Sequence, residues 1–342
     1  MKKALMFVAM MMSASSAIAQ QTQTLTLVQT VRLPGVTGKF DHFAIDLAGK
    51  RLFAAATGNH SVEVIGLATG KVEQSITGLG KPHGLFWEDS TQKLYVADGS
   101  LAQLLVFTGS SNAQLTLAGT LKLSDDADDM AYNPTNHLLF VGHGGSDAAN
   151  PPRIAVVDTK NFSLKSDIPV AAHPEALDID MQSQRIFANI ADSSEIALLD
   201  GNGKAETGTW KLANASHNVP LAYDVEDHVL YVACRAPATL LALDGATGKE
   251  ISRISTGEGA DDLFYDPSSR RVYVISGAGE VDVYEADSNS ALHSLGVIHT
   301  AAGAKTALFV PSQSRLYVGL PDAGGKPAEI RIYSSASKRG RE

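Results

Sequence analysis

The stretch from residue 51 to residue 71, RLFAAATGNHSVEVIGLATGK, holds two short apolar runs separated by TGNH and followed by the turn TGK. Such runs between turn residues are typical of consecutive antiparallel β-strands. The apolar–aromatic pair near its start recurs along the chain at spacings of 42, 45, 47, 44, 42 and 44 residues. The seven copies are Leu52-Phe53, Leu94-Tyr95, Leu139-Phe140, Ile186-Phe187, Leu230-Tyr231, Val272-Tyr273 and Leu316-Tyr317. A period of about 40 to 50 residues is typical of four-stranded blades, so the sequence predicts an all-β fold, a seven-bladed β-propeller.

The last repeat is one strand short. After the apolar run at residues 330–333 the sequence continues as SSAS, whereas residues 24–33, TLTLVQTVRL, alternate like a strand that has no partner nearby. An unpaired edge strand is unfavourable, and closure of the ring removes it. We therefore expect the N-terminal strand to complete the seventh blade.

The first 19 residues have the pattern of a secretory signal peptide. Lys2 and Lys3 precede an apolar block at residues 4–12, and a small-residue cleavage site, AIA, follows. The block is too short to cross a bilayer as a helix. We expect a periplasmic or secreted protein in which residues 20–338 form one propeller and residues 339–342 a basic tail.

The net charge and the cysteine content exclude some classes of partner and of covalent cross-link. The formal net charge of −9 repels phosphate backbones and anionic lipids, so we expect neither a nucleic acid nor a membrane partner. Cys234 is the only cysteine, which excludes an intramolecular disulfide. We expect a monomer that binds a small molecule.

The segments RLFAAATGNHSVEVIGLATGK, KLYVAD and RLYVGL resemble the YVTN repeats of bacterial seven-bladed propellers. Over residues 24–334 the chain resembles an exported YncE-like protein, which implies a propeller and export but no particular activity. Propellers of this shape include lactonases, lyases, dehydrogenase subunits and haem-carrying domains. The sequence has no CxxCH and no strand–loop–helix phosphate motif, so we expect neither a c-type haem nor a nucleotide.

Candidate site residues follow from the repeat. The inner strand of every propeller blade begins near one mouth of the central channel, so equivalent positions should gather there. Eleven residues before each pair stand Asp41, His83, Asp128, Glu175, Val219, Asp261 and Lys305. Ten residues before each pair stand His42, Gly84, Asp129, Ala176, Pro220, Asp262 and Thr306. A register error of about one residue adds His173, His217 and Asn218.

These residue types suggest roles at the mouth. His42 and His83 are acid–base candidates, and Lys305 and Arg235 would orient an anionic substrate as catalytic partners. The predicted ligand-binding residues are Asp41, Asp128, Asp129, His173, Glu175, His217, Asn218, Asp261 and Asp262. The insertion GHGGSDAANPP, residues 142–152, is expected to lie beside the mouth.

A metal is a further expectation. Calcium-dependent lactonase propellers use a Glu, an Asn and an Asp at the channel mouth, and this resemblance implies Glu175, Asn218 and Asp262 as ligands. Oxygen ligands with an occasional imidazole suit calcium, magnesium or manganese. Without a cation, crowded carboxylates should show at least one raised pKa.

Two functions remain open at the level of sequence. The mouth could catalyse a reaction, with metal-assisted lactone hydrolysis or a lyase reaction as the leading candidates. Alternatively the protein is a non-catalytic propeller that binds a ligand or a partner protein on the same face. Asp128 and Asp261 could also serve structure alone, because Asp side chains before propeller strands often accept hydrogen bonds from backbone amides of neighbouring loops.

Overall fold

A computed structural model describes residues 24–110 and 113–335 of the chain. The expected signal peptide, residues 1–19, and the basic tail, residues 339–342, lie outside the described residues. Within the described residues no helix is long and apolar enough to cross a membrane.

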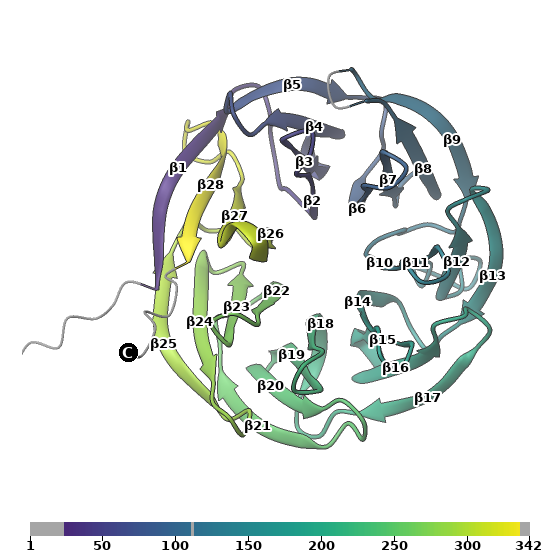
Figure 1. Cartoon of the computed structure of the whole chain (residues 1–342), viewed down its shortest axis with the longest axis vertical. Coiled ribbons are helices and arrows are strands. Elements are labelled where there is room, and N and C mark those ends of the chain that lie inside the picture. Colours follow the sequence, from purple (N-terminus) through teal and green to yellow (C-terminus); the bar gives the residue numbers. More distant parts are fainter. Residues whose placement is uncertain (1–23, 111–112, 336–342) are drawn as a thin grey trace, which may run out of the picture.

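The described chain folds into seven four-stranded antiparallel sheets arranged as a ring, which confirms the predicted seven-bladed β-propeller (Figure 1). Blades one to three contain β2 (Phe43–Asp46), β3 (Arg51–Ala56), β4 (Ser61–Gly66), β5 (Lys71–Ile76); β6 (Pro82–Glu88), β7 (Lys93–Asp98), β8 (Gln103–Thr108), β9 (Thr116–Lys122); and β10 (Met130–Asn133), β11 (Leu138–His143), β12 (Arg153–Asp158), β13 (Ser163–Pro169).

Blades four to six contain β14 (Pro174–Asp180), β15 (Arg185–Ile190), β16 (Glu195–Asp200), β17 (Glu206–Lys211); β18 (Ser216–Asp224), β19 (Val229–Ala236), β20 (Ala238–Asp244), β21 (Glu250–Ser255); and β22 (Ala260–Asp266), β23 (Arg271–Ser276), β24 (Glu280–Ala286), β25 (Leu292–His299). Blade seven contains β26 (Ala307–Val310), β27 (Arg315–Leu320), β28 (Ala328–Ser335) and β1 (Leu25–Leu33). Three short 3₁₀ turns follow strands at η1 (Thr57–Asn59), η2 (Ala191–Ser193) and η3 (Pro311–Gln313).

The N-terminal strand closes the ring. β1 pairs antiparallel with β28 from Leu25 opposite Ser335 to Leu33 opposite Ala328, with one register shift between Leu27 and Gln29. The prediction that this strand completes the seventh blade is therefore confirmed. Leu25 and Leu33 are 1% and 0% exposed, so the pairing also buries apolar side chains.

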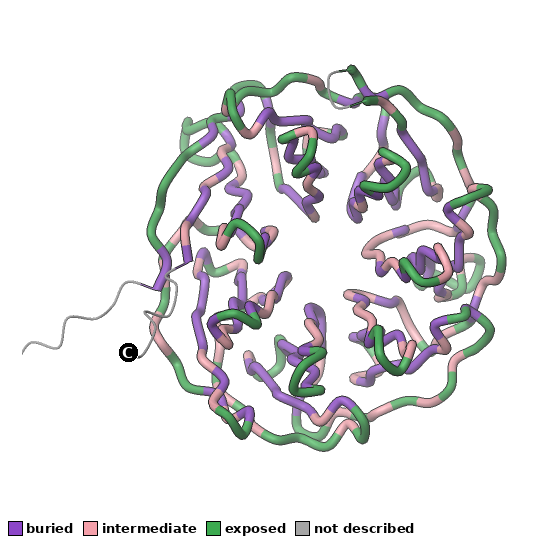
Figure 2. The backbone as a smooth tube through the Cα atoms, in the orientation of Figure 1, coloured by how far each residue is buried: buried purple, intermediate pink, exposed green. Residues whose placement is uncertain are grey.

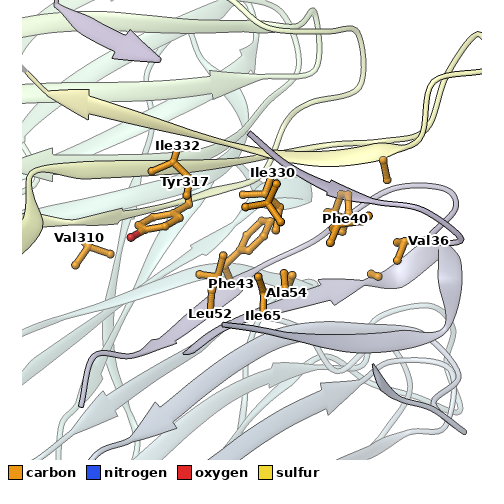
Figure 3. Close-up of a cluster of buried hydrophobic side chains, with 14 residues drawn as sticks. Val36, Phe40, Phe43, Leu52, Ala54, Ile65, Val310, Tyr317, Ile330 and Ile332 are labelled. Atoms are coloured by element: carbon orange, nitrogen blue, oxygen red, sulfur yellow. The ribbon is translucent and has the colours of Figure 1, made fainter. Parts of the chain in front are cut away.

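The core lies between the blades. The apolar–aromatic pairs fall on the second strand of each blade, and Phe53, Tyr95 and Tyr273 are fully buried. Figure 2 shows the inner strands largely buried and the outermost strands largely exposed. At the seam between the first and last blades, Phe43 packs in one cluster with Tyr317 and Ile330 (Figure 3). Burial of each such side chain stabilises the fold by about 1.5 to 3 kcal/mol.

Irregular starts of the inner strands position the site. The pairing of the inner with the second strand shifts register between Pro82 and Leu85, Pro174 and Leu177, Asn218 and Leu221, and Ala260 and Asp262. Such bulges redirect side chains and are common beside functional sites. His83, Glu175 and Asp261 lie within these bulges and line one cavity at the mouth of the channel.

Candidate functional site

A cavity of about 200 Å³ lies at the mouth where the inner strands begin. Its lining is almost entirely ionisable, with acids and bases contributed by all but one of the seven inner-strand entrances. The lining residues are Lys39, Asp41, His42, Lys81, His83, Asp126, Asp128, Asp129, His173, Glu175, Ala176, Val219, Arg235, Asp261 and Lys305.

Asp41 and His83 form a buried pair from neighbouring blades. Nδ1 of His83 lies 2.6 Å from Oδ2 of Asp41, and the two side chains are 5% and 9% exposed. Burial lowers the pKa of His83, but the hydrogen bond to Asp41 and the charge of Asp128 outweigh burial and raise it. Nε2 of His83 is buried and has no hydrogen-bond partner within residues 24–110 and 113–335. The arrangement orients one ring nitrogen and leaves the other available.

His42 is enclosed by carboxylates. Its Nε2 lies 3.7 Å from Asp41 Oδ1 and 3.9 Å from Asp128 Oδ1, and its Nδ1 lies 3.5 Å from Asp262 Oδ1. Burial lowers the pKa of His42, but Asp129 and the three other carboxylates raise it to about 10. At neutral pH His42 is therefore an imidazolium, a fixed cation that cannot act as a general base.

His173 joins the mouth from the other side. Its Nδ1 lies 2.6 Å from the carbonyl oxygen of Gly144, within the insertion, so the insertion borders the mouth as expected. Its Nε2 lies 3.8 Å from Asp128 Oδ2 and 4.0 Å from Asp126 Oδ2. Glu175 lies nearby, and burial together with the charge of Asp128 raises the pKa of Glu175 to about 7.

Asp261 is paired with two cations. It accepts a hydrogen bond from Arg235 and contacts the ammonium group of Lys305. Arg235 also donates through Nε to the carbonyl oxygen of Ala260 at 2.8 Å, which fixes its orientation. Burial lowers the pKa of Lys305, but Asp261 outweighs burial and raises it, so Lys305 stays positive at neutral pH.

Asp129 and Asp262 brace neighbouring blades. Asp129 Oδ2 accepts from the backbone N–H of Leu177 at 3.1 Å, and Asp262 Oδ2 accepts from that of Ala307 at 2.6 Å. Accepting a backbone hydrogen bond was the structural role considered for Asp128 and Asp261. The next residue in each case, Asp129 or Asp262, has this role instead. Burial raises the pKa of Asp262 to about 8.

His217 and Asn218 do not line the cavity. His217 has a positive φ of 53°, its side chain is 57% exposed, and Asp192 lies 4.0 Å away. Asn218 is buried inside its blade, where Nδ2 donates to Asn189 Oδ1 at 2.8 Å and to the carbonyl oxygen of Glu195 at 2.9 Å. The local backbone of the fifth blade, with its bulge after Asn218, turns both side chains elsewhere.

The expected metal ligands are consequently not brought together. Asn218 is engaged within its blade, and Asp262 contacts the backbone of Ala307. Among the described His, Cys, Asp and Glu residues, two groups have potential ligand atoms within 4.8 Å of one another. These groups are Asp41, His42 and Asp128, and Asp128, His173 and Glu175. Any cation at the mouth would therefore need a different set of donors from the expected one.

Sequence reasoning missed three lining residues. Lys39, Lys81 and Asp126 stand two positions before Asp41, His83 and Asp128. Residues two apart in an extended chain point the same way, so a third set of positions, thirteen residues before each apolar–aromatic pair, would have included them. The same set of positions contains His173.

A second cavity of about 360 Å³ continues into the channel. It shares His42, Asp129 and Ala176 with the mouth cavity, and its other walls are mainly apolar. Asp178 is an exception, and burial raises its pKa to about 6 while Oδ2 accepts from the backbone of Tyr223 at 2.8 Å. His42 thus lies where the polar mouth meets the apolar channel.

Fold and site define a seven-bladed β-propeller with an ionisable mouth cavity. No protein-family model matches the chain. Over 147 residues the chain is 26% identical to Seven-bladed beta-propeller protein Rv1057 of Mycobacterium tuberculosis, covering 42% of this chain and 36% of that protein. Over 210 residues it is 23% identical to 6-phosphogluconolactonase of Yersinia enterocolitica, covering 58% of this chain and 62% of that protein. The matches thus span less than two thirds of the length of either relative.

Solved structures share the fold at low identity. A chain of the mitotic checkpoint complex has a TM-score of 0.76 and 13% identity, covering 98% of this chain and 99% of that chain. A chain of Kuenenia stuttgartiensis hydrazine synthase has a TM-score of 0.75 and 15% identity, covering 90% and 99%. At these identities the likeness concerns the fold alone.

Proposed function

We propose that this protein is an exported propeller of the YVTN type that binds a small anionic molecule in the mouth cavity and hydrolyses a lactone there. The observation that carries the proposal is the 2.6 Å pair of Asp41 and His83 in a cavity that also holds the cations Arg235 and Lys305. A histidine oriented by a carboxylate beside fixed cations suits acyl transfer to water. Similarity to a 6-phosphogluconolactonase favours lactones that carry a phosphate.

The chemistry assigns one task to each group. His83, oriented by Asp41, takes a proton through Nε2 from a water molecule whose oxygen attacks the lactone carbonyl carbon. The imidazolium of His42 stabilises the negative oxygen that develops there. When the ring C–O bond breaks, protonated His83 returns the proton to the leaving alkoxide, so the product is an open-chain hydroxy acid.

Other groups bind and polarise the substrate. Arg235 and Lys305 hold the anionic group of the substrate, because both are oriented by Asp261 and remain charged. A divalent cation bound among the carboxylates of the cavity would polarise the lactone carbonyl. The proposal includes a monomer in the periplasm or outside the cell, with no haem, nucleotide, nucleic acid or membrane partner.

A second candidate is a non-catalytic binding protein. Asp126 lies 3.9 Å from Nε2 of His83 and 3.3 Å from the ammonium group of Lys81, so a carboxylate paired with a cation stands beside the proposed base. Together with Asp261 and its two cations, this pairing provides fixed charges that suit recognition alone.

The test compares chemistry with binding. We expect the purified protein to hydrolyse glucono-1,5-lactone 6-phosphate. Formation of the hydroxy acid is measured by the protons that it releases, and the product is identified by mass spectrometry. His83→Gln should reduce kcat by about 100-fold or more, the scale of general base catalysis. An exposed control, His217→Gln, should retain activity. Tight binding of 6-phosphogluconate without hydrolysis would support the binding protein, and an unsaturated product would indicate a lyase.

A further inference from the structure

We propose that Asp128, His173 and Glu175 form a site for one first-row transition-metal cation, Mn²⁺ or Zn²⁺, on the wall of the mouth cavity. Potential ligand atoms of these three residues all lie within 4.8 Å of one another. Two donors on opposite sides of one such ion lie at most about 4.4 Å apart, given metal–ligand distances of about 2.0 to 2.2 Å. In a tetrahedral site, however, donors lie about 3.3 to 3.6 Å apart, so the three side chains have to close in by up to about 1.5 Å to complete the site.

The tautomer of His173 favours a metal. Nδ1 lies 2.6 Å from the carbonyl oxygen of Gly144, which can only accept a hydrogen bond, so Nδ1 carries the proton. Nε2 faces Asp128 and Asp126, at 3.8 and 4.0 Å, and a cation bound there would replace the proton that these carboxylates favour on it. Metal-binding histidines commonly donate their other ring N–H to a backbone carbonyl in this way.

The alternative group, Asp41, His42 and Asp128, lacks that property. Both ring nitrogens of His42 face carboxylates, Nε2 toward Asp41 and Asp128 and Nδ1 toward Asp262. This geometry stabilises a doubly protonated ring, which has no lone pair for a metal. The imidazolium of His42 already supplies the positive charge there.

Buried polar atoms without partners provide an independent indication of a missing ligand. The side chain of His83 is 5% exposed, yet its Nε2 has no hydrogen-bond partner among the described residues. Oδ1 of Asp128 is also buried without a partner in that part of the chain, but it faces His42 and His83, whereas Oδ2 faces His173. The carboxylate of Asp126 lies between the Nε2 atoms of His83 and His173, at 3.9 and 4.0 Å. An ion or its bound water at this point would satisfy such atoms.

The donor set selects the metal. One imidazole and two carboxylates suit Mn²⁺ or Zn²⁺, whereas Ca²⁺ prefers six to eight oxygen ligands.

The experiment measures metal binding to the full chain without substrate, so it is independent of lactone hydrolysis. Metal-free protein is titrated calorimetrically with Mn²⁺, Zn²⁺, Mg²⁺ and Ca²⁺ in separate runs. We expect one Mn²⁺ or Zn²⁺ per chain and at least tenfold weaker binding of Ca²⁺ and Mg²⁺. His173→Gln and Glu175→Gln should each weaken binding by at least tenfold, and His217→Gln should not.

Thermal melting of each variant shows whether it is folded. Two ligand positions are substituted separately, so that the test still stands if one of the variants fails to fold. Unchanged Mn²⁺ and Zn²⁺ affinity in both ligand variants would overturn the proposal. Loss of binding in His42→Gln alone would overturn it as well, because it would move the cation to the other group. Metal binding without lactone hydrolysis would leave the site standing and reject the proposed reaction.

Discussion

Nδ1 of His42 lies 3.5 Å from Oδ1 of Asp262, at the point where the mouth cavity meets the channel. The two residues are far apart in sequence and come from the first and sixth blades, so only closure of the ring brings them together. Asp129 and other carboxylates raise the pKa of His42 to about 10 against the effect of burial, and burial raises that of Asp262 to about 8. At neutral pH His42 is cationic, and burial makes the neighbouring Asp262 a much weaker acid than a free aspartate.

The ionisation of His42 should make its contribution to stability depend on pH. Because its folded pKa of about 10 lies above the usual 6.5, the stabilisation is complete below pH 6.5 and is lost as pH rises toward 10. We expect His42→Gln to destabilise the protein by about 3 kcal/mol at pH 6, since it leaves buried carboxylates unpaired. Melting curves from pH 6 to 10.5 should show the gap to wild type closing, whereas His217→Gln should show no such trend. A gap that stays constant with pH would reject this assignment.

Two substitutions of Asp262 should distinguish the contribution of its backbone hydrogen bond from that of its ionisable group. An asparagine keeps an acceptor for the backbone N–H of Ala307, which Asp262 binds at 2.6 Å, and matches the neutral acid. We expect Asp262→Asn to lie within about 1 kcal/mol of wild type at pH 7, and Asp262→Ala to cost about 1 to 3 kcal/mol through the unpaired N–H.

The pH dependence of Asp262 has the opposite sign. With a folded pKa of about 8 against 3.8, wild type loses stability as pH rises from 3.8 toward 8, because only the unfolded chain ionises readily. Asp262→Asn lacks this loss and should gain on wild type across that window. Urea unfolding at pH 5 and pH 8 measures the gain in the free energy of unfolding relative to wild type. The prediction is contradicted if Asp262→Asn and Asp262→Ala lose equal amounts of stability at both pH values.

Much of the fold could be predicted because a propeller repeats one unit. The recurring apolar–aromatic pair gave the blade number, and the unpaired N-terminal strand gave the closure, now seen as the pairing of Leu33 with Ala328. Counting back from the pair also identified most of the mouth, since equivalent strand positions meet on one rim. The count is weakest where a strand is irregular. His217 and Asn218 precede a bulge and turn away from the cavity.

Ionisation states could not be predicted in the same way. They depend on distances across blades, such as that between His42 and Asp262, and these distances are set by how the ring closes. The sequence indicated that acids and bases would meet. It could not indicate that His42 would be charged at neutral pH or that His173 would direct Nε2 toward Asp128.

Closure by β1 should be visible in point variants of that strand. Leu33 is fully buried and Leu27 is 48% exposed, although both lie on the same strand. Truncation of a buried leucine removes apolar contacts and leaves a cavity, so Leu33→Ala should destabilise the protein by about 2 to 5 kcal/mol. Leu27→Ala is the matched control and should change stability by about 0.5 kcal/mol or less. Equal unfolding midpoints for the two variants would show that closure of the last blade contributes little.

The two cations paired with Asp261 should act on substrate charge and not on the chemical step. Arg235→Gln removes a group that is 36% exposed and oriented by Ala260 and Asp261, so the fold should tolerate the change. A charge-assisted hydrogen bond contributes about 1.5 to 3 kcal/mol, which corresponds to an increase in KM of about 10- to 100-fold for glucono-1,5-lactone 6-phosphate. The KM for the uncharged glucono-1,5-lactone should stay the same, and kcat for both should change little. Lys211→Gln, which removes a largely exposed cation paired with Glu195 in the fourth blade, serves as the control. An equal loss for charged and uncharged lactones would mean that Arg235 shapes the cavity and does not recognise the anion.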